Sequence, residues 1–206
     1  MNHLNEIKSY WSKRAEGYSI SNRESLKSDE KQQYEEFFKK YIPTNKKLKT
    51  IDMGCGPGFL AILLANMGCD SFAFDCTENM LLKAEENARD LGVNLNIIQG
   101  DAQNPKIEDN TFDLLVSRNL IWNLEDPEKA YKEWIRIVKP GGKIIIFDAN
   151  WYLSYFDENL RKEVEKAQVN YKNKYGTPYE SCTKETPDEF YKSLPLSSKL
   201  RPNWDE

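Results

Sequence analysis

The chain contains few of the residues from which metal and redox sites are built. Its 206 residues include one histidine, His3, and four cysteines, Cys55, Cys69, Cys76 and Cys182. None of the cysteines forms a CxxC pair, and no zinc-type spacing relates them to His3. The sequence therefore indicates no metal site and favours reduced thiols, which are typical of a cytoplasmic protein.

Long apolar runs and a strong charge imbalance are also absent. No run approaches the roughly 18–20 apolar residues that cross a bilayer, and the amino terminus lacks the apolar centre of a secretory signal. The 29 basic and 33 acidic residues give a net charge of -4, and the basic residues are dispersed. We therefore expect one soluble cytoplasmic domain that binds neither a membrane nor nucleic acid.

What the sequence does contain is an alternation of strand and helix patterns between residues 48 and 148. Apolar runs predict strands, and amphipathic stretches with capping residues predict helices. The expected strands are Leu48–Met53, Ser71–Asp75, Leu95–Gln99, Phe112–Ser117 and Lys143–Asp148, and the expected helices are Phe59–Met67, Glu78–Leu91 and Pro127–Val138. This alternation requires crossover connections, so it predicts an α/β fold: a Rossmann-like, doubly wound, mostly parallel sheet with helices on both faces.

The glycine-rich stretch Ile51-Asp-Met-Gly-Cys-Gly-Pro-Gly-Phe59 joins the first predicted strand to the first helix of this core. Ligands of doubly wound sheets bind at the carboxyl ends of strands, and glycine allows a close approach of backbone and ligand. The GxGxxG pattern of dinucleotide-binding proteins requires a glycine where this chain has Phe59, and a P-loop requires GK[ST], which is absent. For the loop alone, a tight turn without a ligand is the alternative.

Four further motifs follow the loop in order. They are Asp75 at the end of the second strand, Gly100-Asp101-Ala102, Phe112–Ser117 and Val138–Ile146, and the loop itself reads Asp52-x-Gly54-x-Gly56-x-Gly58. Together they resemble the motifs of class I S-adenosylmethionine-dependent methyltransferases, in particular the small-molecule (type 11, ubiquinone- and menaquinone-biosynthesis-like) group. The resemblance implies that the chain binds S-adenosyl-L-methionine, transfers its methyl group to a small-molecule acceptor by in-line displacement, and leaves S-adenosyl-L-homocysteine.

The resemblance also assigns roles to individual residues. Asp75 is expected to hold the ribose hydroxyls, Met80 to pack on the adenine, and Asp101 to bind the adenine edge. The full expected cofactor site is Tyr18, Asp52, Gly54, Cys55, Gly56, Gly58, Asp75, Cys76, Met80, Asp101, Ala102 and Ser117. Structural alternatives stay open from the residues alone: Asp75 as a helix cap, Met80 as core, Asp101 as a turn former, and Asp52 as an acceptor for the loop's own amides.

The acceptor is expected above the same edge of the sheet, where residues 10–18, 117–122 and 148–152 converge. Aromatic side chains there either exclude water and stabilise the cofactor's cation, or are ordinary packing residues. The candidates are Tyr10, Arg118, Trp122, Asn150 and Trp151. Arg118 is equally compatible with an anionic acceptor and with an acid of the fold. No catalytic base is assigned.

By this resemblance the chain divides into an N-terminal helical lid (1–42), a cofactor-binding core (43–149) and a helical cap on the acceptor side (150–206). Helices are expected over residues 24–41 and 155–175, and a short one from Thr186. Family members carry an antiparallel strand pair after the fifth strand, and no pattern for it is evident before Glu206. We therefore expect the fifth strand's edge to be covered by residues 150–206 or by self-association. This difference leaves a cofactor-binding protein without transferase activity as the alternative.

Overall fold

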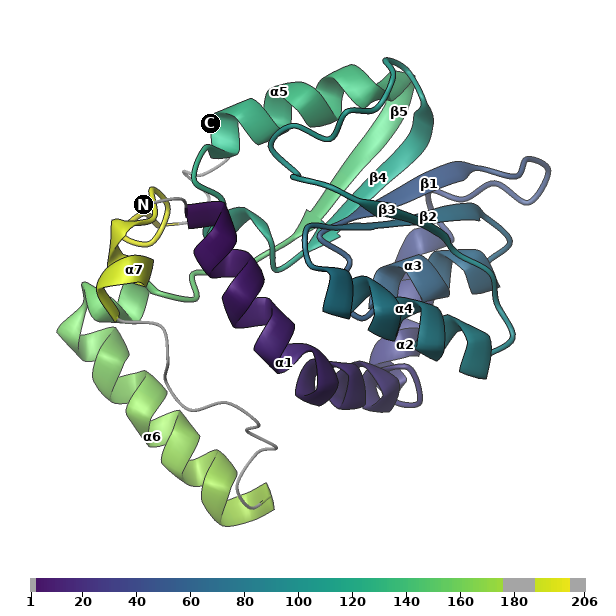
Figure 1. The fold of residues 1–206 in the computed structure, drawn as a ribbon. Helices are drawn as coiled ribbons and strands as arrows, with labels where there is room; N and C mark the ends of the chain where they lie inside the picture. Colours follow the sequence, from purple (N-terminus) through teal and green to yellow (C-terminus); the bar gives the residue numbers. More distant parts are fainter. Residues whose placement is uncertain (1–2, 176–187, 201–206) are drawn as a thin grey trace.

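The computed structural model of the protein describes residues 3–175 and 188–200 and has a five-stranded sheet at its centre (Figure 1). The strands are β1 (Lys49–Met53), β2 (Asp70–Asp75), β3 (Asn96–Gln99), β4 (Phe112–Arg118) and β5 (Val138–Phe147). They lie in the order β3-β2-β1-β4-β5, and every neighbouring pair is parallel. The predicted doubly wound α/β fold is confirmed, and the strand order reverses between β1 and β4.

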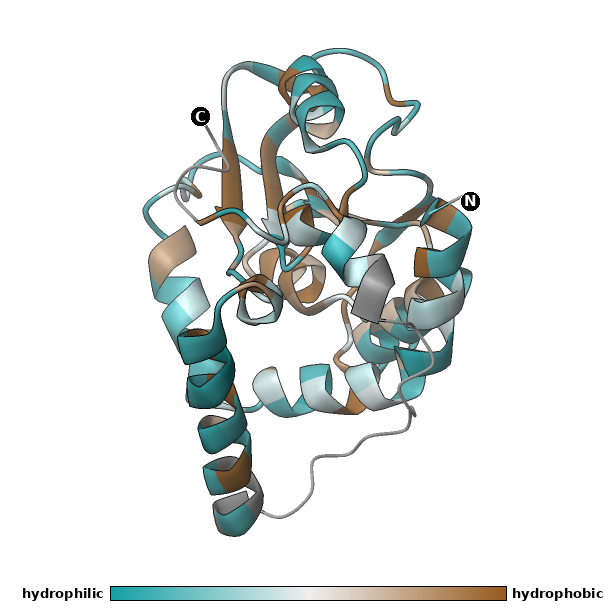
Figure 2. Cartoon of the chain, turned by 90° about the vertical axis from the view of Figure 1, so that its left-hand side faces the viewer, coloured by the Kyte–Doolittle hydropathy of each residue, from teal (hydrophilic) through white to brown (hydrophobic). Residues whose placement is uncertain are grey.

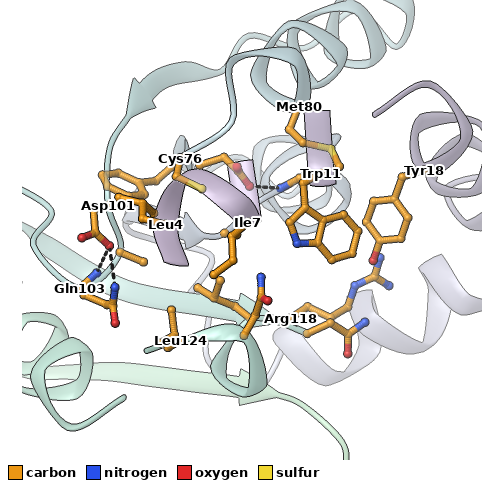
Figure 3. A pocket seen from close by; sticks show the side chains of 18 residues that line it. Leu4, Ile7, Trp11, Tyr18, Cys76, Met80, Asp101, Gln103, Arg118 and Leu124 are labelled. Carbon is orange, nitrogen blue, oxygen red and sulfur yellow. Dashed lines mark hydrogen bonds between the residues drawn. The ribbon is translucent and has the colours of Figure 1, made fainter. Parts of the chain in front are cut away.

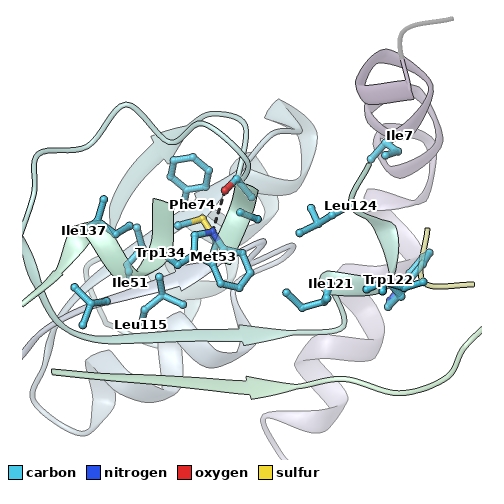
Figure 4. Close-up of a cluster of buried hydrophobic side chains, with 14 of the residues drawn as sticks. Ile7, Ile51, Met53, Phe74, Leu115, Ile121, Trp122, Leu124, Trp134 and Ile137 are labelled. Atoms are coloured by element: carbon cyan, nitrogen blue, oxygen red, sulfur yellow. Dashed lines mark hydrogen bonds between the residues drawn. The ribbon is translucent and has the colours of Figure 1, made fainter. Parts of the chain in front are cut away.

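Helices cover both faces of this sheet (Figure 1). One face carries α2 (Asp29–Phe38), α3 (Phe59–Asn66) and α4 (Glu78–Asp90), and the other carries α5 (Pro127–Ile137). The sequence of α3, FLAILLAN, is apolar almost throughout, as a helix with little exposure requires. The α5 face instead buries Trp134 and Leu115 completely (Figure 4).

Capping residues and a bulge explain several element boundaries. Ser28 Oγ accepts a hydrogen bond from Glu30 N at 3.2 Å and so begins α2. Asp126 Oδ1 accepts from Lys129 N at 3.0 Å at the start of α5. β5 begins earlier than predicted, at Val138, because its Pro-Gly-Gly turn is a bulge within the strand rather than a connection before it.

The amino-terminal helices differ from the prediction. Instead of one helix over residues 24–41, α1 spans His3–Ser25 and α2 spans Asp29–Phe38. The prediction was wrong because the cap at Ser28 divides the segment, and because α1 packs along α4 largely through polar contacts that give no strong apolar period. Of the predicted lid, 1–42, only α1 reaches the cavity described below.

The segment after β5 is helical, as predicted. A 3₁₀ turn (Leu153–Tyr155) precedes α6 (Glu158–Tyr175), and α7 spans Asp188–Ser193; the predicted start at Thr186 lies outside the described residues. Much of the α6 ribbon is hydrophilic and extends away from the sheet (Figure 2). Within residues 3–175 and 188–200, β5 pairs with β4 alone, and no helix there has the length and apolar content of a membrane span.

Candidate cofactor site

A cavity lies at the carboxyl ends of the strands, beside the point where the strand order reverses (Figure 3). This is the position at which doubly wound sheets bind ligands. Its floor is the loop after β1, its walls are the ends of β2 and β4, and α1 closes its mouth. The cavity volume is about 80 Å³, below the roughly 300–1,000 Å³ of typical ligand pockets. The cavity as it stands is therefore smaller than a typical ligand pocket.

The loop after β1 depends on glycine for its shape. Gly54 and Gly58 have φ values of +72° and +90°, in the left-handed region. A Cβ at Gly54 would lie 2.8 Å from Leu120 Cδ2, and one at Gly58 would lie 3.0 Å from Ala84 Cβ. The loop therefore packs directly against the segment after β4 and against α4, and it presents its backbone to the cavity.

Asp75, at the end of β2, lines the cavity and also holds backbone around it. Its Oδ2 accepts from Gly56 N at 3.0 Å, and its Oδ1 accepts from Thr77 N at 2.8 Å, just before α4. Burial raises the pKa of Asp75, and these amide hydrogen bonds partly offset the rise. The side chain thus binds the amide of Thr77, the residue before α4, and does not cap the helix itself, while it still faces the cavity.

Asp101 follows β3, the strand beside β2, and lines the same cavity. Its Oδ1 accepts from Gln103 N at 2.9 Å and from Gln103 Nε2 at 3.2 Å (Figure 3). Next to it, Ala102 O accepts from Trp134 Nε1 at 2.9 Å, which fixes this loop to α5. Two carboxylates from adjacent strands therefore face one cavity.

Comparisons with known proteins agree with this architecture. The family model described as a methyltransferase domain matches residues 44–195. The chain belongs to this family. A solved structure from Methanococcus maripaludis, described as an S-adenosyl-L-methionine-dependent methyltransferase, is 30% identical, with a TM-score of 0.57 over 76% of this chain and 72% of that one. The predicted resemblance to class I methyltransferases is confirmed.

Among curated relatives, phosphoethanolamine N-methyltransferase 3 from Arabidopsis thaliana is 33% identical over 101 residues, 48% of this chain and 21% of the relative. A demethylmenaquinone methyltransferase from Desulfitobacterium hafniense is 37% identical over 103 residues, 48% of this chain and 41% of the relative. The chain thus spans less than half of the length of either relative.

Most of the predicted cofactor residues of this methyltransferase domain meet at the cavity. Those that line it are Tyr18, Gly54, Gly56, Asp75, Cys76, Met80, Asp101 and Ala102. Cys55 and Gly58 belong to the loop but do not line the main cavity. Ser117 also stays outside, because its buried Oγ donates to Met53 O at 2.9 Å and links β4 to β1.

Asp52 is 2% exposed and lies beneath the loop. Its Oδ2 accepts from Ala61 N at 3.0 Å, which satisfies an amide donor in the first turn of α3. Burial raises its pKa to about 7, against the opposing effects of that hydrogen bond and of Arg118. It borders a separate cavity of about 20 Å³. Asp52 thus accepts from an amide of α3, whereas its structural alternative named the loop's own amides as the donors.

Of the predicted acceptor residues, Arg118 alone lines the main cavity. Its Nη1 pairs with Glu30 Oε1 of α2 at 2.9 Å, and its guanidinium lies 4.1 Å from the centre of the Phe59 ring. Arg118 therefore pairs with an acid of the fold, the second of its two predicted roles.

The other acceptor candidates lie beside the cavity or away from it. Trp122 is 5% exposed, and the centre of its ring lies 4.8 Å from that of Tyr152. In the same aromatic cluster the ring centres of Tyr10 and Trp11 are 5.1 Å apart. Asn150 Nδ2 donates to Lys199 O at 2.8 Å, while Trp151 is 51% exposed. Trp122 and Tyr10 thus support the cavity wall, and Trp151 does not contribute to it.

Several lining residues were not named among the predicted site residues. Trp11, Asn119 and Leu120 lie in the predicted stretches 10–18 and 117–122, whereas Leu4, Ile7, Phe74, Gln103, Asn123 and Leu124 lie outside them. The lining residues on α1 do have a signal in the sequence. Leu4, Ile7, Trp11 and Tyr18 recur at helical spacing, which marks one face of that helix. Asn119 has an unusual backbone in the structure, with a φ of +59°, but the sequence carries no signal for it.

Proposed function

We propose that the chain binds S-adenosyl-L-methionine in this cavity and transfers its methyl group to a small-molecule acceptor, leaving S-adenosyl-L-homocysteine. The observation that carries the proposal is the pair of carboxylates, Asp75 and Asp101, that face one cavity from adjacent strands above the glycine loop. The family membership of residues 44–195 supports methyl transfer over simple binding.

The residues present fit this cofactor. A carboxylate has about four acceptor positions, and the two backbone amides that bind Asp75 use two of them. The remainder suit the two hydroxyls of a ribose. Asp101 keeps Oδ2 as an acceptor for an amino group, since Gln103 binds Oδ1. Met80, 2% exposed on the first turn of α4, supplies an apolar wall for a flat ring.

When bound, the cofactor supplies an electrophilic methyl group on a positively charged sulfur. The chain's own contribution is position and exclusion of water. Asp75 and the loop hold the ligand against the sheet, and Tyr18 and Trp11 of α1 cover it. An aromatic face near the sulfur also stabilises a cation. These effects act on alignment and encounter rather than on proton transfer.

The lining on the β4 side favours an uncharged acceptor with an apolar or ring-shaped body. It combines Leu120 and Leu124 with the side-chain amides of Asn119 and Asn123. The one basic residue of the described lining, Arg118, is paired with Glu30. Among the acceptors named for the relatives, this chemistry suits a demethylated quinone better than phosphoethanolamine, whose phosphate calls for cationic or bidentate partners.

Two experiments test the proposal. Calorimetry is expected to show saturable binding of S-adenosylmethionine and S-adenosylhomocysteine, and no saturation at millimolar ligand would refute the cofactor assignment. Incubation with S-adenosylmethionine and either a demethylated quinone analogue or phosphoethanolamine separates an enzyme from a binder. We expect S-adenosylhomocysteine to form with the quinone analogue only. If S-adenosylmethionine binds but no S-adenosylhomocysteine forms with any acceptor offered, the result would favour the alternative of a binding protein without transferase activity.

We further propose a cytoplasmic protein whose partners are small molecules rather than nucleic acids, and which self-associates through the edge of β5. The net charge of -4 and the free thiols of Cys55, Cys69 and Cys76 support the first part; Cys182 lies outside the described residues. For the second part, β5 pairs on one side only in the described chain, and Ile144 and Ile146 on it are half-buried.

A further inference from the structure

Two serine–asparagine pairs join α1 to α4. Ser12 Oγ accepts from Asn79 Nδ2 at 2.6 Å, in an exposed position. Two turns further along, Ser19 Oγ donates to Asn87 Oδ1 at 3.1 Å, and both of these residues are buried, with exposed fractions of 0% and 1%. The two pairs join the same residue types, but they differ in donor and in burial, and also in what each asparagine contacts next.

Asn87 continues the contact into the glycine loop. Its Nδ2 donates to Pro57 O at 2.9 Å. A backbone carbonyl can only accept, so this bond assigns the amide nitrogen to the Pro57 side and the amide oxygen to Ser19. One buried side chain thus uses a donor on the loop and an acceptor on α1 at the same time. Neither a carboxylate nor an apolar side chain of similar size can make both bonds.

The loop end of this bridge adjoins Gly56, a residue that lines the cavity. Pro57 lies between Gly56 and Gly58, which both have positive φ, +52° and +90°. A Cβ at Gly58 would approach Ala84 Cβ to 3.0 Å, and Ala84 lies one helical turn before Asn87 on α4. The helix therefore holds the loop by a close packing contact and by one directed hydrogen bond.

The α1 end of the bridge lies where the helix covers that loop. Tyr18, the neighbour of Ser19, lines the cavity, and its Cε1 lies 3.5 Å from the place a Cβ would take on Gly56. Within α1 itself, Asn22 Nδ2 donates to Tyr18 O at 3.0 Å. This part of α1 therefore lies directly over the glycine loop.

We propose that Asn87 is a positioning residue for the cofactor: its amide couples the docking of α1 over the cavity to the conformation of the glycine loop. The inference rests on the cofactor site proposed above. It assigns Asn87 no contact with the ligand. Asn87 is coupled to α1 through its bond to Ser19 and to the loop through its bond to Pro57 O. Loss of either bond therefore weakens ligand binding without removing a lining residue.

The serine pairs give a matched test. Ser19→Ala and Ser12→Ala each delete one hydroxyl of α1 that bonds an asparagine of α4, and only the first is tied to the loop. Calorimetry with S-adenosylhomocysteine is expected to show a dissociation constant at least fivefold higher for Ser19→Ala and within twofold of the unmodified chain for Ser12→Ala. Equal affinities for the two variants overturn the coupling.

Asn87→Asp tests the loop side. The aspartate still accepts from Ser19 but cannot donate to Pro57 O. We expect a dissociation constant at least tenfold higher, with a binding stoichiometry near that of the unmodified chain, and little further loss when Ser19→Ala is added. A purely structural role predicts the opposite: fewer competent molecules and a lower melting temperature at an unchanged dissociation constant.

The outcomes separate this inference from the cofactor assignment. If the unmodified chain fails to bind S-adenosylhomocysteine, the cofactor site itself is wrong. If it binds, and Ser19→Ala and Asn87→Asp bind equally well, the coupling alone is wrong. Should Asn87→Asp not fold, the serine pair decides, since each of its members removes a single hydroxyl.

Discussion

Asp75 combines two tasks in one carboxylate, because it orders the loop and offers acceptors to the cavity. Asp75→Ala removes both, whereas Asp75→Asn keeps an oxygen for one amide and removes the charge. We expect Asp75→Asn to raise the dissociation constant for S-adenosylhomocysteine by about tenfold or more, since hydrogen bonds to charged groups contribute about 1.5–3 kcal/mol. Calorimetry measures this change.

Asp70 provides the control for that substitution, because it stands on the same strand at the opposite end. Its Oδ1 accepts from Asn96 Nδ2 at 3.0 Å, far from the cavity lining. Asp70→Asn is expected to bind S-adenosylhomocysteine as the unmodified chain does. A parallel loss in both variants would point to a general effect on β2, and no loss in Asp75→Asn would exclude Asp75 from the site.

Asp52 makes the stability of the fold depend on pH. Its pKa rises from an ordinary 3.8 to about 7, mainly through burial. The folded chain therefore holds a proton that the unfolded chain has released, and stability falls as pH rises between these values. Asp52→Asn keeps an acceptor for Ala61 N and removes the titration. The free energy of unfolding of Asp52→Asn minus that of the unmodified chain should therefore increase by at most about 1.4 kcal/mol per pH unit from pH 5 to 7.

Urea unfolding of both chains at pH 5, 6 and 7 measures that difference, and the other ionisable groups cancel because the two chains share them. Parallel pH profiles would show that Asp52 is ionised throughout the range. This role for Asp52 could not be predicted from its motif, because the donor that it satisfies, Ala61 N, is placed by the packing of α3 on β1.

At the scale of the element, apolar periodicity decided what could be predicted from the sequence. All five strands and the helices α3, α4 and α5 carry their burial in short apolar runs or stripes, and they occur where expected. α1 was expected only as part of a helical lid over residues 1–42, and its bounds were missed because the face that lies on α4 is formed by hydroxyl, amide and charged side chains. The register of those polar contacts depends on the partner helix, which periodicity within one segment does not describe.

α1 leads to a prediction that compares two tryptophans. Trp11 lines the cavity and lies 5.5 Å from Tyr18, ring centre to ring centre, whereas Trp151 is 51% exposed and outside the lining. Trp11→Ala should raise the dissociation constant for S-adenosylhomocysteine by about tenfold, because the half-buried Trp11 would bury further against a ligand, and full burial of a large apolar side chain contributes on the order of 1.5–3 kcal/mol. Trp151→Ala should leave it unchanged.

Calorimetry on the two tryptophan variants, with circular dichroism to confirm the fold, tests the closing face of α1. Equal losses of affinity in the two variants would mean that Trp151 belongs to the site, as predicted from the sequence. No loss in either variant would mean that α1 stands clear of the ligand and that the aromatic face serves packing alone.

At the scale of the molecule, the site divides into a part that the sequence predicts and a part that it does not. The cofactor side comes from strand ends, and the β1–β4 switch point follows from strand order, so motifs at strand ends locate it. The proposed acceptor side depends on side chains far apart in the chain: the Tyr152 ring stacks on that of Tyr191, with ring centres 4.4 Å apart, and Trp122 meets Tyr152 edge to face at 4.8 Å. No local pattern links such residues.

The edge of β5 carries the last prediction. Its half-buried isoleucines, and a backbone edge that pairs with no strand among residues 3–175 and 188–200, form a template for another strand. If two copies associate there, sedimentation should show a dimer that grows with concentration, and amide exchange of residues 143–147 should slow in parallel. Amides of β1, which is paired on both sides, serve as the control. A monomer at all concentrations whose β5 amides exchange slowly throughout would instead mean that the chain covers its own edge, because protection that does not depend on concentration cannot come from a second copy.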